Sequence, residues 1–411
     1  MFTANAFLLG AAGARADHAW AVDTVITTGS TVNGIGAIRN NATVIVRQPA
    51  GSLMVSGDLH VGWGASNTGH LQVLGGSNVM STNGTLALNA NSGGTAIISG
   101  ANSRWITTGT LTVGDEGTGT LTVTDGGFVT APGGLIVGNF NTANSAASVL
   151  NIGSAANVAT PAAAGTLNTS SVGGYGTVQI NHSGTTHLTS DGTDTGNAIA
   201  LTGALNIVQT GGTTVFMGAN DYSGTTTVNG GILSVNGNQS GATGAVAVNR
   251  GATLGGTGTS GGETIIGSGA TLDPGGAGGT LSFTQDVTLQ GGAKLVMDIL
   301  GTGAGEFDVL NFSGTGSLSF LPGSTLELRL ASSGLEGEFH LNIITGGVAI
   351  SVPSGGLILD GAQPGWEFSL DANGVLHHTQ QIPEPSTYAL FGAIGAVALA
   401  LARRRRALRV N

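Results

Sequence analysis

Histidines are the side chains in this sequence that most readily bind metals or transfer protons, and they are scattered. The eight histidines occur singly or in pairs, and none stands in an HExxH arrangement. They are His18, His60, His70, His182, His187, His340, His377 and His378. His182 and His187 are separated by a spacing that matches no common zinc motif. We expect His377 and His378 to be solvated, so the histidines predict no metal site and no cofactor.

Paired carboxyl groups could act as a general acid and base, and two pairs stand close together in the sequence. Asp115 and Glu116 are adjacent, so on a strand they would point to opposite faces. Glu306 and Asp308 are two residues apart and could share a face, but their glycine-rich surroundings favour surface solvation. Calcium could bridge Asp115, Glu116 and Asp125, yet the sequence has no GGxGxDxUx repeat. No catalytic residue is predicted, and no GxSxG elbow or Walker loop occurs.

The charge balance argues against nucleic-acid binding. The chain has 22 acidic and 12 basic residues, and Arg403 to Arg406 and Arg409 lie together at the C-terminus. The remaining residues therefore offer few cations to neutralise phosphates. A β-helical polysaccharide lyase or glycosidase, our second hypothesis, would need several acids and a basic residue in one groove. Arg104, Arg250 and Arg329 are the candidates for that basic residue.

Short strands joined by tight turns are the elements that would position these side chains. Of the 411 residues 74 are glycine, and only 8% are charged, against roughly 25% in most globular proteins. Thr, Ser, Asn, Val and Leu fill the spaces between glycines, which favours strands over helices. The sequence has no cysteine, which excludes disulfides and thiol catalysis.

Internal repeats predict how these strands are stacked. A segment of the type LxVG begins at Leu59, Leu86, Leu111 and Leu135, with spacings of 27, 25 and 24 residues. A drifting period of this size is typical of solenoid coils, which bury a continuous core only when stacked. We predict an all-β fold, a right-handed parallel β-helix with one hydrophobic helix at the C-terminus. A stacked β-sandwich and a β-propeller are the alternatives.

A second repeat type begins at residue 218 with GANDYSGTTTVNGG. It resembles the autotransporter-associated β-strand repeat, and the resemblance implies a β-helical passenger region. Those proteins translocate through a C-terminal unit that a different tail replaces here, so we do not expect self-translocation. We expect Tyr222 to pack over a corner between coils, with contact to a sugar as the alternative. Asn220 and Asp221 are expected to form turns.

These patterns divide the chain into segments. We predict a candidate signal peptide at 1–21, β-solenoid repeats at 22–290 with the autotransporter-type repeat near 215–276, and a β capping region at 291–376. In the capping region strands are expected at 294–300, 308–312, 317–320, 325–330, 339–344, 349–352 and 357–359. A tight turn is expected at Asp371 to Gly374, and a linker at 377–382.

The tail at 383–411 combines three parts in a specific order. Pro383, Glu384, Pro385 and Ser386 are followed by an apolar stretch at 389–402 and then by Arg403, Arg404, Arg405 and Arg406. This order resembles the PEP-CTERM sorting signal of Gram-negative bacteria. The resemblance implies that exosortase recognises the Pro-Glu-Pro motif and removes the tail.

The physical properties of the tail agree with a membrane segment. A helix over 389–402 would be about 21 Å long, and the bilayer core is roughly 30 Å thick, so flanking arginines must reach into the interface. Arg403 to Arg406 should stop transfer and stay cytoplasmic, which places the body outside that membrane. A buried or amphipathic terminal helix is the alternative.

The sequence as a whole predicts an exported, non-enzymatic protein that passes the inner membrane on its way to the cell surface or extracellular matrix. Phe7 to Gly13 with Ala16 or Ala21 is consistent with an atypical or truncated signal peptide, and an ordinary N-terminus is the alternative. Threonine- and asparagine-rich faces predict a structural or adhesive role, with an exopolysaccharide as a partner. A surface protein whose tail is never removed is a further alternative.

Overall fold

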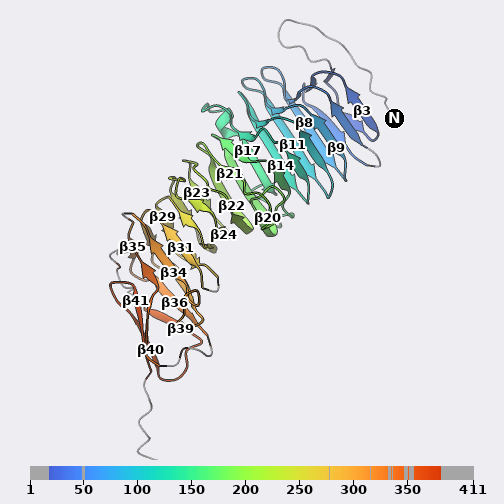
Figure 1. Cartoon of the computed structure of the whole chain (residues 1–411). Coiled ribbons are helices and arrows are strands. Elements are labelled where there is room, and N and C mark those ends of the chain that lie inside the picture. The colour runs from blue at the N-terminus through green and yellow to red at the C-terminus, as the bar shows by residue number, and fades with distance from the viewer. Residues whose placement is uncertain are drawn as a thin grey trace, which may run out of the picture.

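The computed structural model describes residues 18–48, 51–276, 278–314, 316–331, 335, 337–346, 350 and 356–380. These residues form a long stack of short strands that runs from one end of the molecule to the other (Figure 1). A short 3₁₀ helix, η1 (Ser145–Ala147), lies between two of the strands. No helix in the described part of the chain is long and apolar enough to cross a membrane. The apolar segment at 389–402 lies outside that part.

Three parallel sheets build the N-terminal half of the stack, and each of the first six coils contributes one strand to each sheet. The first sheet contains β1 (His18–Trp20), β4 (Gly36–Ile38), β7 (Leu59–Val61), β10 (Gly84–Leu86), β13 (Leu111–Val113), β16 (Leu135–Val137), β19 (Ser171–Gly174) and β21 (Ala200–Leu201). The second contains β2 (Thr24–Ile26), β5 (Ala42–Val46), β8 (Thr68–Leu74), β11 (Gly93–Ser99), β14 (Thr118–Thr124), β17 (Val149–Gly153), β20 (Thr177–His187) and β22 (Asn206–Phe216). The third contains β3 (Gly29–Val32), β6 (Ser52–Val55), β9 (Asn78–Ser81), β12 (Arg104–Thr107), β15 (Phe128–Thr130) and β18 (Thr166–Asn168).

The second sheet divides at β22, where the sequence changes its repeat type. Ile207 to Gln209 of β22 pair with β23, and Thr213 to Phe216 pair with β24. One ladder continues as β23 (Thr226–Val228), β26 (Val246–Val248), β29 (Thr264–Ile266), β32 (Val287–Leu289) and β35 (Leu318–Phe320). The other continues as β24 (Gly231–Val235), β27 (Ala252–Gly256), β30 (Thr271–Pro274), β33 (Lys294–Ile299), β36 (Thr325–Leu330) and β39 (Leu357–Asp360). A separate ladder contains β25 (Asn238–Gln239), β28 (Thr259–Ser260), β31 (Thr280–Phe283), β34 (Val309–Phe312) and β38 (Ile344–Thr345).

Alternation of apolar and polar residues produces this arrangement. In β8, Gly69, Leu71 and Val73 are buried and the residues between them face outwards, as the period of two in a strand requires. The same pattern recurs in β11 and β14, so the buried side chains of successive coils form one continuous core. The predicted all-β solenoid of parallel strands is thereby confirmed.

The register of the repeats differs from the prediction at one coil. Gly84, and not Leu86, pairs with Leu59 and Leu111, while Leu86 pairs with Val61. A Cβ atom on Gly84 would lie 2.6 Å from Cζ2 of Trp105, which is fully buried. The Trp105 ring therefore fills the space that a leucine side chain fills in the neighbouring coils. Trp105 belongs to the third sheet, so the LxVG pattern of the first sheet does not show that its ring replaces a leucine. The pattern therefore placed the start of this strand at Leu86, two residues too late.

The C-terminal part corrects two predicted boundaries. Parallel pairing continues through β33, β36 and β39, so the solenoid sheets do not end at residue 290. Thr325–Leu330 is a strand as predicted, and only Ile350 of the strand expected at 349–352 lies in the described residues. Residues 377–380 belong to β41 (Val375–Gln380) and are not a linker. His377 and His378 pair with residues 339–340 on one side and with residues 368–369 on the other. The short segment alone does not indicate this pairing, because its partners are distant along the chain.

A three-stranded antiparallel sheet stands at the C-terminal end of the stack (Figure 1). It contains β37 (Phe339–Asn342), β40 (Trp366–Leu370) and β41, and the predicted turn at 371–374 connects β40 to β41. In that turn Gly374, with φ of 82°, donates its N–H to the carbonyl of Asp371. Trp366, Leu370 and Leu376 extend the solenoid core into this sheet, which supports the proposal that it caps the last coil.

The first described strand lies inside the predicted signal peptide. β1 pairs with β4, and Trp20 is buried in the core. Cleavage after Ala21 would remove this strand, whereas cleavage after Ala16 would leave it in place. We therefore propose the earlier site if a peptide is removed.

Candidate functional site

The corner between the first and second sheets repeats along the N-terminal half of the stack. At the end of β7, β10, β13, β16 and β19, or directly after it, the chain turns through a residue with positive φ, namely Gly62, Ala87, Gly114, Gly138 and Gly174. Backbone hydrogen bonds stack successive corners: the Asp115 N–H donates to the Ala87 carbonyl, and the Asn139 N–H donates to the Gly114 carbonyl. The side chains that follow these turns are therefore presented side by side at the strand spacing of about 4.8 Å.

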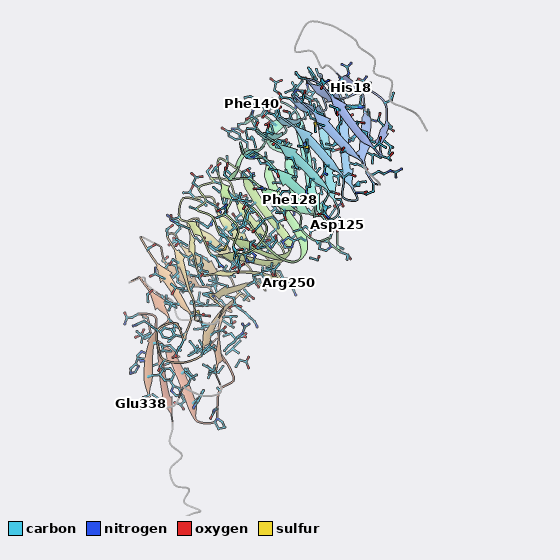
Figure 2. The ribbon with its side chains drawn as sticks, turned by 45° about the vertical axis from the view of Figure 1, so that its right-hand side comes forward. His18, Asp125, Phe128, Phe140, Arg250 and Glu338 are labelled. Atoms are coloured by element: carbon cyan, nitrogen blue, oxygen red, sulfur yellow. The ribbon has the colours of Figure 1, made fainter. Side chains whose placement is uncertain are left out.

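Three aromatic side chains reach solvent along this corner. Trp63 follows β7 and is half-buried, Phe140 follows β16 and is 47% exposed, and Tyr175 follows β19 and is 40% exposed. Phe140 projects from the edge of the stack (Figure 2). An open pocket of about 430 Å³ lies beside it, lined also by Ala90, Glu116, Thr142 and Asn144. We call Trp63, Glu116, Phe140, Asn144 and Tyr175 the corner surface.

The loop that carries Phe140 is fastened to the neighbouring coils. The Asn139 amide donates to the Asp115 carboxylate at 2.6 Å, and the Asn144 amide donates to the Asn91 side-chain oxygen at 2.9 Å. The Ser145 hydroxyl donates to the carbonyl of Gly114 at 3.0 Å. Phe140 is therefore held in an outward position instead of folding back onto apolar surface, and such pre-organisation lowers the entropy cost of binding.

The polar groups around Phe140 complete the chemistry of the pocket. Glu116 is exposed, and its Oε2 accepts the N–H of Ala90 at 3.2 Å. A carboxylate has capacity for further hydrogen bonds, and the Asn144 amide carries both donors and an acceptor. The arrangement suits a ligand with one apolar ring face and hydroxyl groups at its edge.

Polar side chains on the outer face of the second sheet bond to one another across coils. His70 Nδ1 lies 2.7 Å from the Thr95 hydroxyl, and His70 Nε2 lies 3.1 Å from the Asn41 side-chain oxygen. Further along the same sheet, between β14 and β17, the Asn151 amide donates to the Thr122 hydroxyl at 3.0 Å. These contacts stabilise neighbouring coils and hold the outward-facing groups in fixed positions.

The structure separates the carboxyl groups that the sequence had grouped. Asp115 and Glu116 lie in a corner loop, not on a strand, and Asp125 accepts from the Ser99 hydroxyl in another corner. Glu306 accepts the N–H of Gly303 within its own loop, whereas Asp308 is fully buried. The shared acid–base face expected as one option for these two residues is thus not formed.

Asp308 has a structural role. Its Oδ1 accepts the N–H groups of Gly278 and Gly279, and its Oδ2 accepts the N–H of Asp298 at 2.9 Å. Burial raises the pKa of the Asp308 carboxyl to about 6, although the backbone donors favour its charged form. The surface solvation predicted for Asp308 is therefore wrong, because the carboxylate satisfies three backbone donors inside the stack.

The candidate arginines also lie apart. Arg104 stands over the Phe128 ring at 5.1 Å. Arg329 lies 3.5 Å from Asp273 and 3.7 Å from Glu327, and Glu327 also pairs with Lys294. These exposed pairs form a network on the outer face of β30, β33 and β36, where opposite charges on neighbouring strands balance one another.

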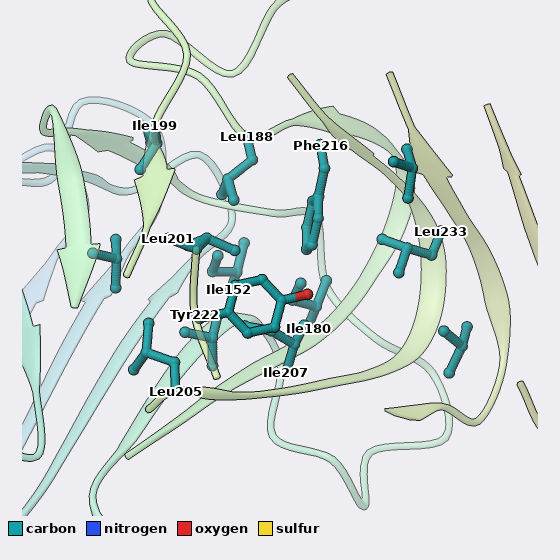
Figure 3. Close-up of a cluster of buried hydrophobic side chains, with 14 of the residues drawn as sticks. Ile152, Ile180, Leu188, Ile199, Leu201, Leu205, Ile207, Phe216, Tyr222 and Leu233 are labelled. Carbon is teal, nitrogen blue, oxygen red and sulfur yellow. The ribbon is translucent and has the colours of Figure 1, made fainter. Parts of the chain in front are cut away.

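Tyr222 and Asn220 belong to the core. Tyr222 is 4% exposed among apolar side chains such as Leu201, Leu205 and Ile207 (Figure 3), and its hydroxyl lies 2.6 Å from that of Thr226. Burial raises the pKa of Tyr222 to about 12. The predicted packing role of Tyr222 is confirmed. Asn220, expected in a turn, is buried and accepts the N–H of Leu201 through its side chain.

The histidines occupy different surroundings. His60 and His182 are buried, and burial lowers the pKa of both. His378, which we expected to be solvated, is fully buried, whereas His377 is partly exposed and contacts His340. No group of three or more histidine or acidic side chains in the described residues has the arrangement of a metal site. The sorting residues Pro383 to Ser386 and Arg403 to Arg406 lie outside the described part of the chain.

The fold and this surface define a β-solenoid with an exposed aromatic corner. Residues 381–406 match the family model of the PEP-CTERM protein-sorting motif. The chain is also 41% identical over 119 residues to a protein named adhesin BmaC autotransporter, from Brucella suis biovar 1 (strain 1330). That match covers 28% of this chain but only 3% of the adhesin. The sorting signal and the autotransporter-type repeats expected from the sequence are confirmed, and both matches support an exported protein of the cell surface.

Proposed function

We propose that this chain is a non-enzymatic, adhesive β-solenoid that binds a polysaccharide at the cell surface or in the extracellular matrix of a Gram-negative bacterium. The observation that carries the proposal is the tied loop that holds Phe140 outwards beside Glu116 and Asn144. The aromatic ring would stack on the apolar face of a sugar, and the polar groups would bond to its hydroxyls. The name of the partial relative, an adhesin, supports this role.

The corner surface favours a neutral polysaccharide over an acidic one. Its charged member is the acidic Glu116, and the chain carries a net charge of −10, so both would repel an acidic polysaccharide. Trp63 and Tyr175 lie four coils apart in the first sheet, a span of about 19 Å at the strand spacing. Several weak contacts along one extended sugar chain would add up through multivalency.

The delivery route follows from the tail. Exosortase would recognise Pro383, Glu384, Pro385 and Ser386, while residues 389–402 cross the inner membrane in transit and Arg403 to Arg406 remain cytoplasmic. Intact mass and fractionation of the protein in its host test this route. We expect a shortened chain outside the cell, and an uncut chain in the inner membrane when Pro383 to Pro385 are replaced by alanine. An uncut wild-type chain would instead indicate a permanent anchor.

Binding to the host exopolysaccharide tests the adhesive role. We expect Phe140→Ala to weaken binding about tenfold, the effect of losing about 1.4 kcal/mol of contact energy. Leu300→Ala is the matched control, because Leu300 is a comparably exposed apolar residue (44%) far along the stack. Equal affinities of the wild type and the Phe140 variant, or no binding by either, would contradict the proposal.

A further inference from the structure

Two histidines from strands far apart in the sequence meet on the antiparallel sheet at the C-terminal end. His340 on β37 is the cross-strand neighbour of His377 on β41. Their Nδ1 atoms lie 2.7 Å apart, and both side chains reach solvent. Two nitrogen atoms at this distance must share one proton between them, since two lone pairs would repel each other.

A turn fixes the orientation of one of the two rings. Asp371 begins the turn at 371–374, and its Oδ1 accepts the N–H groups of Asn373 and Val375, both at 2.9 Å. Its other oxygen, Oδ2, lies 3.3 Å from Nε2 of His377. Because the carboxylate only accepts hydrogen bonds, Nε2 of His377 carries a proton and its Nδ1 is directed towards His340.

We propose that His340 and His377 chelate a divalent transition-metal ion through their Nδ1 atoms, with Asp371 as the positioning residue. A histidine that binds a metal typically donates its other ring N–H to a carboxylate, as His377 does here. Imidazole ligands suit zinc, nickel and copper. Tetrahedral zinc with bonds of about 2.0–2.1 Å needs nitrogen atoms roughly 3.3 Å apart, so the rings must separate by about 0.6 Å.

The adjacent His378 is not part of this chelate. Its side chain lies on the opposite face of β41, stacked against Phe339 at 4.5 Å between ring centroids. Its Nδ1 bonds to the carbonyl of Gly337 at 2.7 Å. Two protein ligands leave the remaining metal positions to water or to a group from outside, so the site would be labile and suited to bridging the chain to another ligand.

Zinc titration of the full-length chain in detergent, followed by isothermal calorimetry at pH 7, tests the proposal. We expect one zinc ion per chain, and loss of this binding in His340→Ala and in His377→Ala. His187→Ala, a half-buried histidine in β20, is the control and should bind as the wild type does. Absence of zinc binding by the wild type, or unchanged binding by both histidine variants, would overturn the site.

Asp371→Asn separates the chelate from a merely structural effect. An asparagine can still accept the N–H groups of Asn373 and Val375, so the turn should persist. Its amide would donate to Nε2 of His377 and place the ring proton on Nδ1, which blocks the metal. We expect affinity to fall about 10- to 100-fold with an unchanged far-UV circular dichroism spectrum. Unchanged affinity would show that Asp371 does not position the ligand.

Discussion

Gly84 and Trp105 should tolerate replacement together but not singly. The neighbouring coils carry Leu59 and Leu111 at the position of Gly84, and Val79 and Val129 at the position of Trp105. The double variant Gly84→Leu/Trp105→Val therefore gives this coil the residues of its neighbours. Each single variant instead leaves either a collision or a cavity in the core.

The magnitudes follow from the contacts. A Cβ atom on Gly84 would lie 2.6 Å from both Trp105 and Leu111, so Gly84→Leu should cost about 3 kcal/mol through overpacking. Trp105→Val empties part of the core and also removes the 3.2 Å bond to the Ser81 hydroxyl, at a cost of about 3–4 kcal/mol. The double variant roughly conserves volume and should cost about 2 kcal/mol, mostly the lost Ser81 bond. The coupling energy is then about 4 kcal/mol.

Amide hydrogen exchange of peptides from β7, β10 and β13 measures this coupling locally, which matters because solenoid coils can open separately. A rescue of 1–2 kcal/mol by the second substitution corresponds to roughly 5- to 30-fold slower exchange than in either single variant. Gly84→Leu combined with Phe283→Val, a buried aromatic residue in a distant coil, is the control and should be additive. Additive effects in the Gly84/Trp105 pair would refute the assignment of Trp105 as the side chain that fills the space over Gly84.

Other residues give further tests. Burial raises the pKa of Asp308 to about 6, above the usual value of about 4, so the stability contributed by its protonated form is present below about pH 4 and is lost as the pH rises through 6. Asp308→Asn should remove this pH dependence of the free energy of unfolding in urea and cost about 1–3 kcal/mol at pH 7. A pH dependence that persists in the variant would contradict this assignment. Tyr222→Phe should cost about 1 kcal/mol. Burial raises the pKa of Tyr222 to about 12, so the substitution should remove a component near that pH from an ultraviolet titration of the tyrosines; an unchanged titration curve would show that Tyr222 is not buried. Arg329→Ala should change stability by less than about 1 kcal/mol, because its ion pairs are exposed, and a larger loss in thermal unfolding would indicate a stronger network.

The sequence allowed the fold class to be predicted because every coil meets the same physical demand. Leu71 and Val73 alternate with outward-facing residues in β8, and the pattern repeats at each coil, so periodicity and alternation both indicated a stack of strands. The boundary at 290 could not be predicted in the same way. Coils in that region are longer, with Leu326 paired to Leu357, so the repeat in the sequence is less regular and does not indicate that the same sheets continue.

The corner surface and the histidine pair could not be predicted because they depend on contacts between coils and strands. Phe140 gives no signal in the sequence that distinguishes an exposed ring from a core ring. Its exposure results from the bonds of Asn139 and Asn144 to earlier coils. His340 and His377 are 37 residues apart, and only the antiparallel register of β37 and β41 brings them together.

Departures from the repeat differ in whether the structure compensates for them. Gly84 departs from its neighbours, but the Trp105 ring fills the space within the core, so the departure has a structural explanation. The coil after β16 also departs, since Leu135 pairs with Val172 at a spacing of 37 residues where Leu111 and Leu135 are only 24 apart. Part of that extra chain forms the loop that holds Phe140 in solvent, and packing within the described residues gives no reason for it. In a repetitive stack, an insertion that is rigidly fastened yet leaves an aromatic ring exposed supports the proposal that a ligand outside the chain binds there.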